Sequence, residues 1–242
     1  MRKKMLISAL AVLACTGVMA QETTTTASTE GGSFTNTGGL YVKGGLNLAN
    51  VSTSSDGSVN SAKTRASFNA GLMGDIPLAN VLSLQIGAEF TGKGSKAQYN
   101  SSFYSGMYTF RPYYVEVPVN LVVKIPIAPG AAITLGAGGY GAIGVAGKYE
   151  TEATSVAGSG TSTQNIKWTD SGDITTGSED GSGAGVLRRY DFGLNFLGGV
   201  ELGPAQISVN YGMGLTKLTS DANNNNDNDK NRVWSLNLAF RL

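Results

Sequence analysis

Eight segments of the chain alternate apolar and polar residues with a period of two, and this pattern constrains the fold more than any other feature. The clearest is residues 82–93, in which Leu84 and Ile86 share one phase and Gln85 and Glu89 the other. Successive side chains of a β-strand point to opposite faces, so each such segment has one apolar and one polar face. A soluble barrel turns the apolar face inward, whereas a membrane barrel turns it outward to lipid. The alternation therefore predicts an all-β fold and leaves its orientation open.

The eight segments are also long enough to cross a membrane. About nine to eleven tilted residues span the apolar layer of a bilayer as a β-strand. The predicted strands cover residues 39–50, 65–76, 82–93, 113–125, 131–150, 189–202, 205–218 and 232–242.

The connections between the predicted strands alternate in length. Those at residues 77–81, 126–130 and 203–204 are short, and the others are long and polar, up to residues 151–188. Short periplasmic turns alternating with long extracellular loops are typical of outer-membrane barrels. Backbone polar groups in lipid must be paired, so the last strand has to pair with the first. We therefore expect an eight-stranded antiparallel up-and-down transmembrane β-barrel with short periplasmic turns and long extracellular loops.

The start of the chain reads as an export signal. Arg2, Lys3 and Lys4 precede an apolar stretch that is too short to span a bilayer as a helix, and a small-residue cleavage site ends at Ala20. A second interpretation makes Cys15 the acylated residue of a lipoprotein box. We expect a signal peptide at residues 1–20, a flexible periplasmic leader at residues 21–38 and a barrel domain at residues 39–242. The signal and the loop lengths favour a bacterial outer-membrane protein over a soluble ligand-binding barrel.

Composition excludes several classes of function. The chain has no histidine, one cysteine and 14% charged residues, which argues against Ser-His-Asp or Cys-His catalysis and a conventional zinc site. Loss of the signal leaves 15 basic against 17 acidic residues, so bulk charge gives no reason to expect nucleic-acid binding. The acidic stretches at residues 179–180 and 227–229 lack the spacing of a calcium loop. We expect no enzyme activity, no metal and no cofactor.

The polar faces of the predicted strands gather charged residues inside the barrel. Glu89 and Glu116 lie on neighbouring strands, and they are either an acid/base pair or partners of lumen cations. The interior of an eight-stranded barrel is just filled by side chains, and buried charges there must be paired. We therefore favour a polar plug over an open channel. The predicted lumen cluster consists of Lys43, Arg65, Glu89, Lys93, Glu116, Asn120, Lys124, Arg189 and Asp191.

Four cations share the lipid-facing phase at the outer ends of the predicted strands, one step beyond aromatic residues that would form a girdle. We hypothesise that they meet lipopolysaccharide phosphates through charge-assisted hydrogen bonds. Ordinary snorkelling at the interface is the alternative. The four cations are Arg111, Arg188, Lys217 and Arg232, and the aromatic residues are Tyr113, Tyr190 and Trp234.

Two further expectations concern irregular positions. Pro118 falls inside a predicted strand, where proline is rare, so we expect a bulge there. Residues 166–168 and the asparagine run at residues 223–226 lie in long connections. Because loops on a rigid scaffold often carry function, we expect these two segments to contact a protein or surface partner.

Six short motifs fall in order along the chain. Together they resemble the porin-like outer-membrane β-barrel domain family, of the PorT-like kind common in Bacteroidota, over about residues 39–242. The resemblance implies an outer-membrane barrel inserted by the assembly machinery, with a role that the family leaves undefined. One departure is the C-terminus, where Arg241 and Leu242 follow Phe240, whereas such barrels usually end on an aromatic residue. The motifs are Val42-Lys43-Gly44-Gly45-Leu46-Asn47, Phe68-Asn69-Ala70-Gly71-Leu72, Leu82-Ser83-Leu84-Gln85, Tyr114-Val115-Glu116-Val117-Pro118-Val119, Tyr190-Asp191-Phe192-Gly193-Leu194 and Tyr211-Gly212-Met213-Gly214-Leu215.

The sequence therefore predicts a non-enzymatic integral outer-membrane barrel with a structural role or a surface-interaction role through its loops. A narrow porin for ions or very small solutes is the alternative. A membrane-embedded hydrolase or acyltransferase is disfavoured by the lack of histidine.

Overall fold

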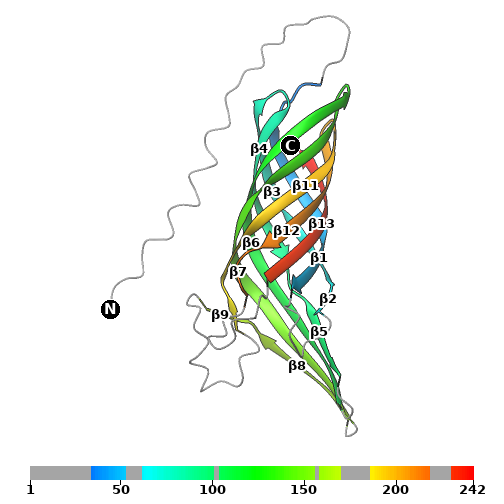
Figure 1. Cartoon of the computed structure of the whole chain (residues 1–242), viewed down its shortest axis with the longest axis vertical. Coiled ribbons are helices and arrows are strands. Elements are labelled where there is room, and N and C mark those ends of the chain that lie inside the picture. The colour runs from blue at the N-terminus through cyan, green and yellow to red at the C-terminus, as the bar shows by residue number, and fades with distance from the viewer. Residues whose placement is uncertain (1–33, 53–61, 101–103, 156–157, 170–185, 219–229) are drawn as a thin grey trace, which may run out of the picture. The chain divides into compact units, whose positions relative to one another are not determined.

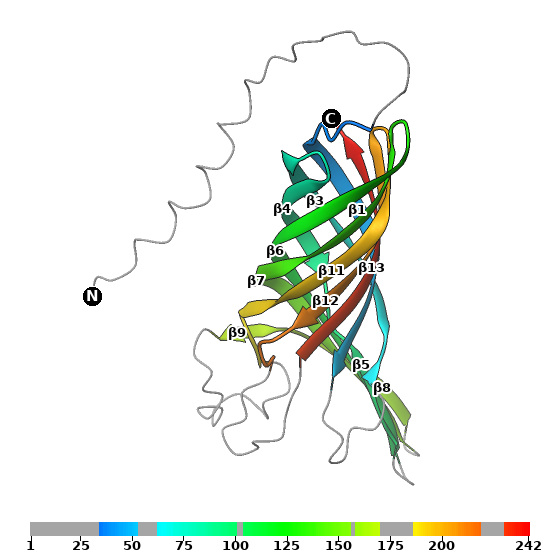
Figure 2. The same cartoon turned by 45° about the horizontal axis from the view of Figure 1, so that its top comes forward.

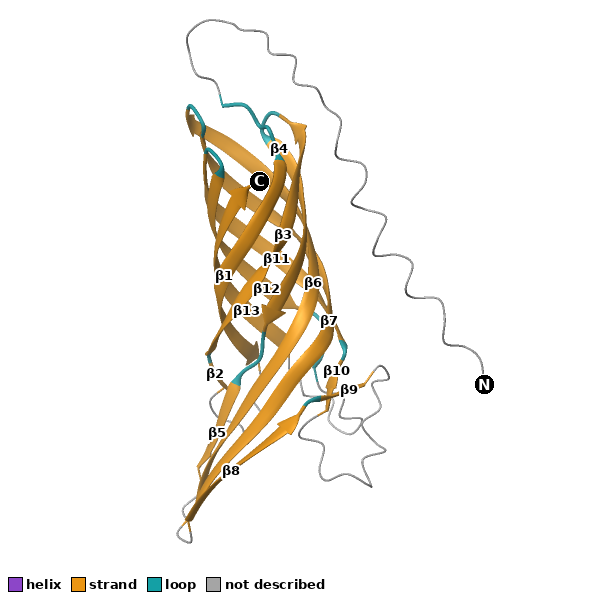
Figure 3. Cartoon of the chain, turned by 180° about the vertical axis from the view of Figure 1, so that it is seen from behind, coloured by secondary structure: helices purple, strands orange, loops and turns teal. Residues whose placement is uncertain are grey.

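The computed structural model describes residues 34–52, 62–100, 104–155, 158–169, 186–218 and 230–242. Its regular elements are all strands (Figure 3). None of the described residues form a helix long and apolar enough to cross a membrane. The expected signal peptide with Cys15, residues 21–33 of the expected leader and the asparagine run lie outside the described residues.

Eight strands close into an antiparallel barrel. Each ring strand pairs with the next along the chain, and the last pairs with the first from Tyr41↔Arg241 to Ser52↔Lys230, so no edge remains in the ring. Figures 1 and 2 show these strands tilted around a common axis. The predicted eight-stranded barrel is confirmed. The ring strands are β1 (Gly39–Ser52), β3 (Arg65–Ala79), β4 (Leu82–Gly92), β6 (Tyr104–Ala128), β7 (Ala131–Ser155), β11 (Tyr190–Leu202), β12 (Ala205–Gly214) and β13 (Lys230–Arg241).

Tight turns join the strands at one end of the barrel, which we call the turn end; the opposite end is the loop end. Two residues separate β3 from β4, β6 from β7, and β11 from β12. Gly130 and Gly203 have φ of +70° and +58° in the last two turns, a backbone conformation that favours glycine. Asn36 is tied to the same end, because its side-chain amide donates to Ser83 Oγ at 2.9 Å and to the Ala79 carbonyl at 3.0 Å.

At the loop end, part of the barrel wall continues as a folded sheet. β5 (Lys96–Asn100) and β8 (Gly158–Asn165) pair with the outer parts of β6 and β7, and we call this four-stranded sheet the extension (Figure 1). The prediction that residues 94–112 and 151–188 are long polar loops was therefore wrong in part. Their polar composition suggested loops, but pairing between hairpins needs no apolar face. Three short strands complete the loop end: β2 (Ala62–Lys63), β9 (Lys167–Thr169) and β10 (Val186–Arg188).

Pro118 causes no bulge, so that expectation was wrong. The register of β4 with β6 is the same on both sides of it, from Ile86↔Val119 to Glu89↔Glu116. The register of β6 shifts instead at residues 113–114 and 126–128. The pyrrolidine ring fits because Gly87 lies beside it: a Cβ at Gly87 would be 3.0 Å from Pro118 Cγ.

The outer surface of the ring is apolar, and its interior is polar. Leu46 is 68% exposed, whereas its neighbour Asn47 is 1% exposed. A soluble protein does not leave a continuous apolar belt in water, so the surface matches a barrel whose outer wall contacts lipid. The soluble-barrel alternative is therefore rejected. Each ring strand contributes to the belt, for example through Leu46, Phe68, Ile86, Val119, Leu135, Phe192, Val209 and Leu236.

Candidate functional site

A buried lysine holds two carboxylates together near the turn end of the lumen. Lys124 Nζ lies 2.5 Å from Asp75 Oδ2 and 2.8 Å from Glu201 Oε2. The Lys124 side chain is 0% exposed, and the two acids are almost as deeply buried. We call these three residues the Lys124 group. Charges buried this deeply are tolerated only when they are paired, so the group locks β3, β6 and β11 together across the interior.

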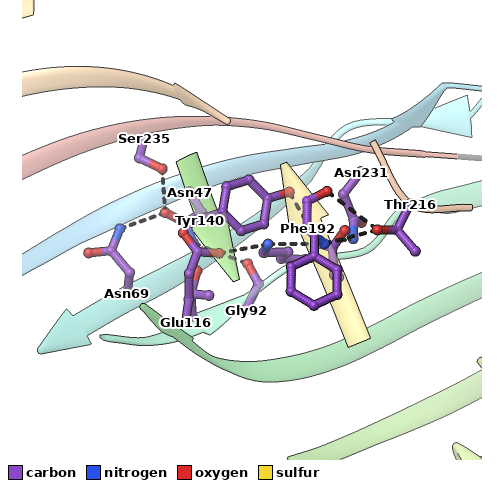
Figure 4. Close-up of polar contacts among 12 residues, drawn as sticks. Asn47, Asn69, Gly92, Glu116, Tyr140, Phe192, Thr216, Asn231 and Ser235 are labelled. Carbon is purple, nitrogen blue, oxygen red and sulfur yellow. Dashed lines mark hydrogen bonds and ion pairs between the residues drawn. The ribbon is translucent and has the colours of Figure 1, made fainter. Parts of the chain in front are cut away.

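Side-chain amides fill the middle of the lumen. Asn69 donates to Asn47 Oδ1 at 2.6 Å, Ser235 donates to the same oxygen at 2.8 Å, and Asn47 donates to Thr91 Oγ1 at 2.9 Å (Figure 4). Short polar side chains from four ring strands thereby form one hydrogen-bonded layer. Beside it, Lys43 Nζ forms an ion pair with Glu89 Oε1 at 2.7 Å.

A second buried lysine organises the lumen nearer the loop end. Lys93 Nζ lies 2.7 Å from Glu116 Oε2 and 2.9 Å from Asp191 Oδ2. The Tyr140 hydroxyl donates to Asp191 at 3.2 Å, and the Asn231 amide donates to the same oxygen at 2.9 Å. The ammonium of Lys93 also lies 4.0 Å from the centre of the Tyr140 ring, within the range of a cation–π contact. We call these five residues the Lys93 group, of which Figure 4 labels Glu116, Tyr140 and Asn231.

Little empty space remains between these layers. Two small cavities in the lumen measure about 10 and 40 Å³. Space of this size holds from one to a few water molecules. Buried amide atoms without a protein partner border the smaller cavity, so ordered water has partners there. The amides are those of Gln85, Asn120, Gln206, Asn210 and Asn237.

The arrangement does not suit acid/base chemistry. Glu89 and Glu116 face each other directly across β4 and β6, but each carboxylate holds a lysine of its own. A general acid or base must reach substrate, whereas Glu89 and Glu116 border a lumen cavity of about 40 Å³, which has room for water but not for a substrate. Among the described residues, no group of three or more His, Cys, Asp or Glu side chains is placed to hold a metal ion.

The structure places eight of the nine predicted lumen residues in the interior. Arg65 lies there at the loop-end side and donates to the Lys93 carbonyl at 2.6 Å. Arg189 differs: it lies in a bend just before β11 and is half-buried, and its carbonyl accepts from the Gly144 amide at 2.7 Å. Sequence reasoning left Asp75 and Glu201 out of the cluster, although both lie in the same phase of their strands as its members. The eight are Lys43, Arg65, Glu89, Lys93, Glu116, Asn120, Lys124 and Asp191.

The four predicted outer cations do not form one cluster. Arg111 lies on β6, has a 45% exposed side chain and pairs with Glu150 at 2.6 Å. Arg232 lies on β13, four strands away in the ring, and donates to the Gly214 carbonyl at 2.8 Å. Lys217 is half-buried after the end of β12. Arg188 belongs to β10, which pairs with β9 and not with a ring strand, and its amide donates to the Leu218 carbonyl at 3.0 Å. Sequence reasoning missed exposed Lys148, which lies directly opposite Arg111 in the register.

An apolar cluster covers the loop end of the lumen. Tyr149, Ile166, Leu187 and Leu218 are buried against one another, and Trp168 packs beside them. The prediction that residues 166–168 contact a partner was wrong for Ile166, which is 6% exposed and packs inside the chain.

One comparison with known proteins identifies the kind of domain. A family model described as outer membrane protein beta-barrel domain matches residues 20–242. No curated protein matches the sequence. Solved structures with some similarity include Ail, the attachment invasion locus protein of Yersinia pestis, at 14% identity, 84% coverage of this chain, 99% of that chain and a TM-score of 0.36. The structure of the same protein in complex with the heparin analogue sucrose octasulfate has 15% identity, covers 85% of this chain and 99% of that chain, and has a TM-score of 0.37. Neisserial surface protein A has 12% identity, covers 84% of this chain and 97% of that chain, and has a TM-score of 0.39.

Proposed function

The chain belongs to the outer membrane protein β-barrel domain family, and from this premise we propose that it is a non-enzymatic barrel with a closed lumen that presents a folded sheet at the cell surface. As an outer-membrane barrel, it exposes its apolar belt to lipid and directs its turn end to the periplasm. The extension then lies outside the cell, because the turn end and the loop end are on opposite sides of the membrane.

The filled lumen is the observation that carries the proposal. The Lys124 group, the amide layer and the Lys93 group follow one another along the barrel axis, and two cavities that the described residues line there measure about 10 and 40 Å³. A hydrated ion needs a continuous water path, and these layers interrupt it. The same ion pairs occupy the carboxylates that a hydrolase or acyltransferase would need.

The exposed extension supports a surface role. All eight residues of β8 are exposed, and the β6 and β7 strands that carry it are 25 residues long. A folded sheet held beyond the lipid is suited to contact a protein or another surface.

In planar bilayers, we expect the purified barrel to give no unitary current above the leak of the membrane. Closed lumen layers leave no route for hydrated ions, whereas the alternative function, a narrow porin, requires steady current steps. A large porin reconstituted in the same way serves as the positive control. Reproducible steps from the native chain that scale with the amount of inserted protein would favour the porin and overturn the closed lumen.

We also propose features that rest on the sequence alone. The residues that precede the barrel carry an export signal cleaved after Ala20 rather than a lipidated Cys15, followed by a periplasmic leader. The C-terminal strand engages the outer-membrane assembly machinery, with Leu242 in the lipid-facing phase. The subfamily is PorT-like.

Phosphates of lipopolysaccharide are the partners that we propose for the outward face near the loop end. Arg111 and Lys148 face each other on β6 and β7, and like charges opposite each other are unfavourable unless an anion joins them. Glu150 neutralises only one of the two. Tyr113 stacks on Phe90 one step nearer the membrane, with ring centres 5.4 Å apart, as expected of an interfacial girdle.

Replacing Arg111 and Lys148 together with glutamine is expected to lower co-purified lipopolysaccharide per barrel at least twofold. The triple variant R188Q/K217Q/R232Q is expected to have a smaller effect, because these three cations are less exposed than Arg111 and Lys148. K167Q, which removes one exposed cation from β9, controls for the loss of a positive charge elsewhere at the loop end. If R111Q/K148Q co-purifies with as much lipopolysaccharide as the native barrel, these cations do not bind its phosphates, and snorkelling at the membrane interface explains their positions.

A further inference from the structure

Residues 166–168 turn inward over the loop end of the lumen. The Ile166 amide donates to the Gly147 carbonyl at 3.0 Å, which fixes the segment to the barrel wall. β9 then pairs in parallel with β10, so that Trp168 lies opposite Leu187. The segment is thereby held by backbone hydrogen bonds on both sides.

Two glycines of β7 make room for the side chains of this segment. A Cβ at Gly144 would lie 2.2 Å from Cζ3 of Trp168, and a Cβ at Gly147 would lie 2.6 Å from Cδ1 of Ile166. No side chain could stand at either position without displacing the aromatic ring or the isoleucine. The barrel wall is thus shaped to receive these two side chains.

Trp168 separates the Lys93 group from the apolar cluster above it. Its ring meets Tyr114 edge to face, with centres 5.5 Å apart. Tyr114 is 0% exposed, and the ammonium of Lys93 lies 5.3 Å from its ring centre on the lumen side. On the other side, Trp168 packs with Ile166, Leu187 and the rest of the apolar cluster.

We propose that Ile166 and Trp168 form a stopper, the apolar barrier that keeps external water and solutes away from the Lys93 group. When the two side chains are displaced from Gly144 and Gly147, the Lys93 group becomes the floor of a pocket that is open to the outside. The opened pocket is not a pore, because the amide layer and the Lys124 group still fill the lumen below it. The stopper acts inside the barrel, so its effect does not depend on which partner the extension contacts.

A cysteine reporter below the stopper tests the barrier. Thr91 is 6% exposed and borders the larger cavity together with Lys93 and Tyr140, so T91C places a thiol under the stopper. The sequence holds one other cysteine, Cys15, which is replaced by serine if mass spectrometry finds it in the mature chain. A charged, membrane-impermeant methanethiosulfonate is added to intact cells. We expect slow labelling of T91C alone and labelling at least tenfold faster when I166A and W168A are added.

A second variant displaces the stopper without truncating it. G144A places a methyl group within the ring of Trp168 and is expected to speed the labelling of T91C as well. G139A, on the same strand, is the matched control, because its Cβ meets only the Gly193 carbonyl at an ordinary 3.4 Å. S162C on exposed β8 reports that the reagent reaches the surface in every background.

Native-like heat-modifiable mobility on gels checks that each variant retains the barrel. Rapid labelling of T91C in the otherwise native chain would show that no seal exists. Equally slow labelling in the I166A/W168A and G144A backgrounds would place the barrier deeper in the lumen. Either result overturns the stopper, whereas faster labelling in both backgrounds, with G139A unchanged, supports it.

Discussion

Replacing Lys124 with methionine is expected to destabilise the folded barrel by about 3–5 kcal/mol, because it leaves an uncompensated buried charge. Lys124 Nζ is the cation between Asp75 and Glu201, and neither acid can reach solvent to recover its hydration. Methionine matches the lysine stem in length, so loss of packing contributes little. Urea unfolding in lipid vesicles, followed by tryptophan fluorescence, measures the free energy of unfolding.

Removing the two acids as well should reverse most of that loss. The triple variant K124M/D75N/E201Q keeps the shapes of the side chains and removes every charge of the Lys124 group. K148M is the control, because Lys148 is exposed on the extension and its loss should change stability by about 0.5 kcal/mol or less. A K124M barrel as stable as the native chain would mean that the Lys124 group does not brace the lumen.

An arginine in place of Leu121 is expected to destabilise the barrel by about 2–4 kcal/mol in a bilayer, the range for a cation at the membrane midplane. Leu121 is 49% exposed on β6 and lies between Leu84 and Ala137 in the register, well inside the apolar belt. The guanidinium would have to leave water for hydrocarbon or distort the lipid around it. On a surface exposed to water, the same substitution would leave the free energy of unfolding almost unchanged. The same vesicle-based unfolding experiment measures the effect.

Leu78 provides the matched control for depth. It is 54% exposed but lies two residues before the first tight turn, at the edge of the belt, so L78R should change stability by about 1 kcal/mol or less. Equal and small effects of L121R and L78R would contradict a lipid-facing belt.

The strands of the ring could be predicted because lipid and lumen impose opposite demands on successive side chains. Leu84 and Gln85 are successive residues that face lipid and lumen, respectively. The short turns show where the chain reverses between paired strands. The extension could not be predicted in the same way. β8 lies wholly in water, so its residues carry no apolar phase, and only its pairing with β7 makes it a strand.

The sequence could predict which residues of the candidate site face the lumen, but it could not predict which of them contact one another. The period of two places Lys93 and Asp191 in the lumen, yet it does not give the depth of either along the axis. The partners of Lys124 come from β3 and β11, and neither strand is a neighbour of β6 in the ring. Such contacts depend on strand tilt and side-chain length. The fit of Trp168 against Gly144 joins a loop segment to the wall, and no local pattern in the sequence marks it.

Nitroxide labels at Leu121, Val209 and Leu236 test the orientation of the barrel most directly. These three outward side chains are between 46% and 55% exposed on β6, β12 and β13. With the barrel in lipid vesicles, electron paramagnetic resonance measures how strongly molecular oxygen and a water-soluble nickel chelate relax each label. Labels in hydrocarbon will collide often with oxygen and rarely with nickel, and this is the predicted result at all three sites. Strong relaxation by nickel with weak relaxation by oxygen would place these side chains in water and contradict the account.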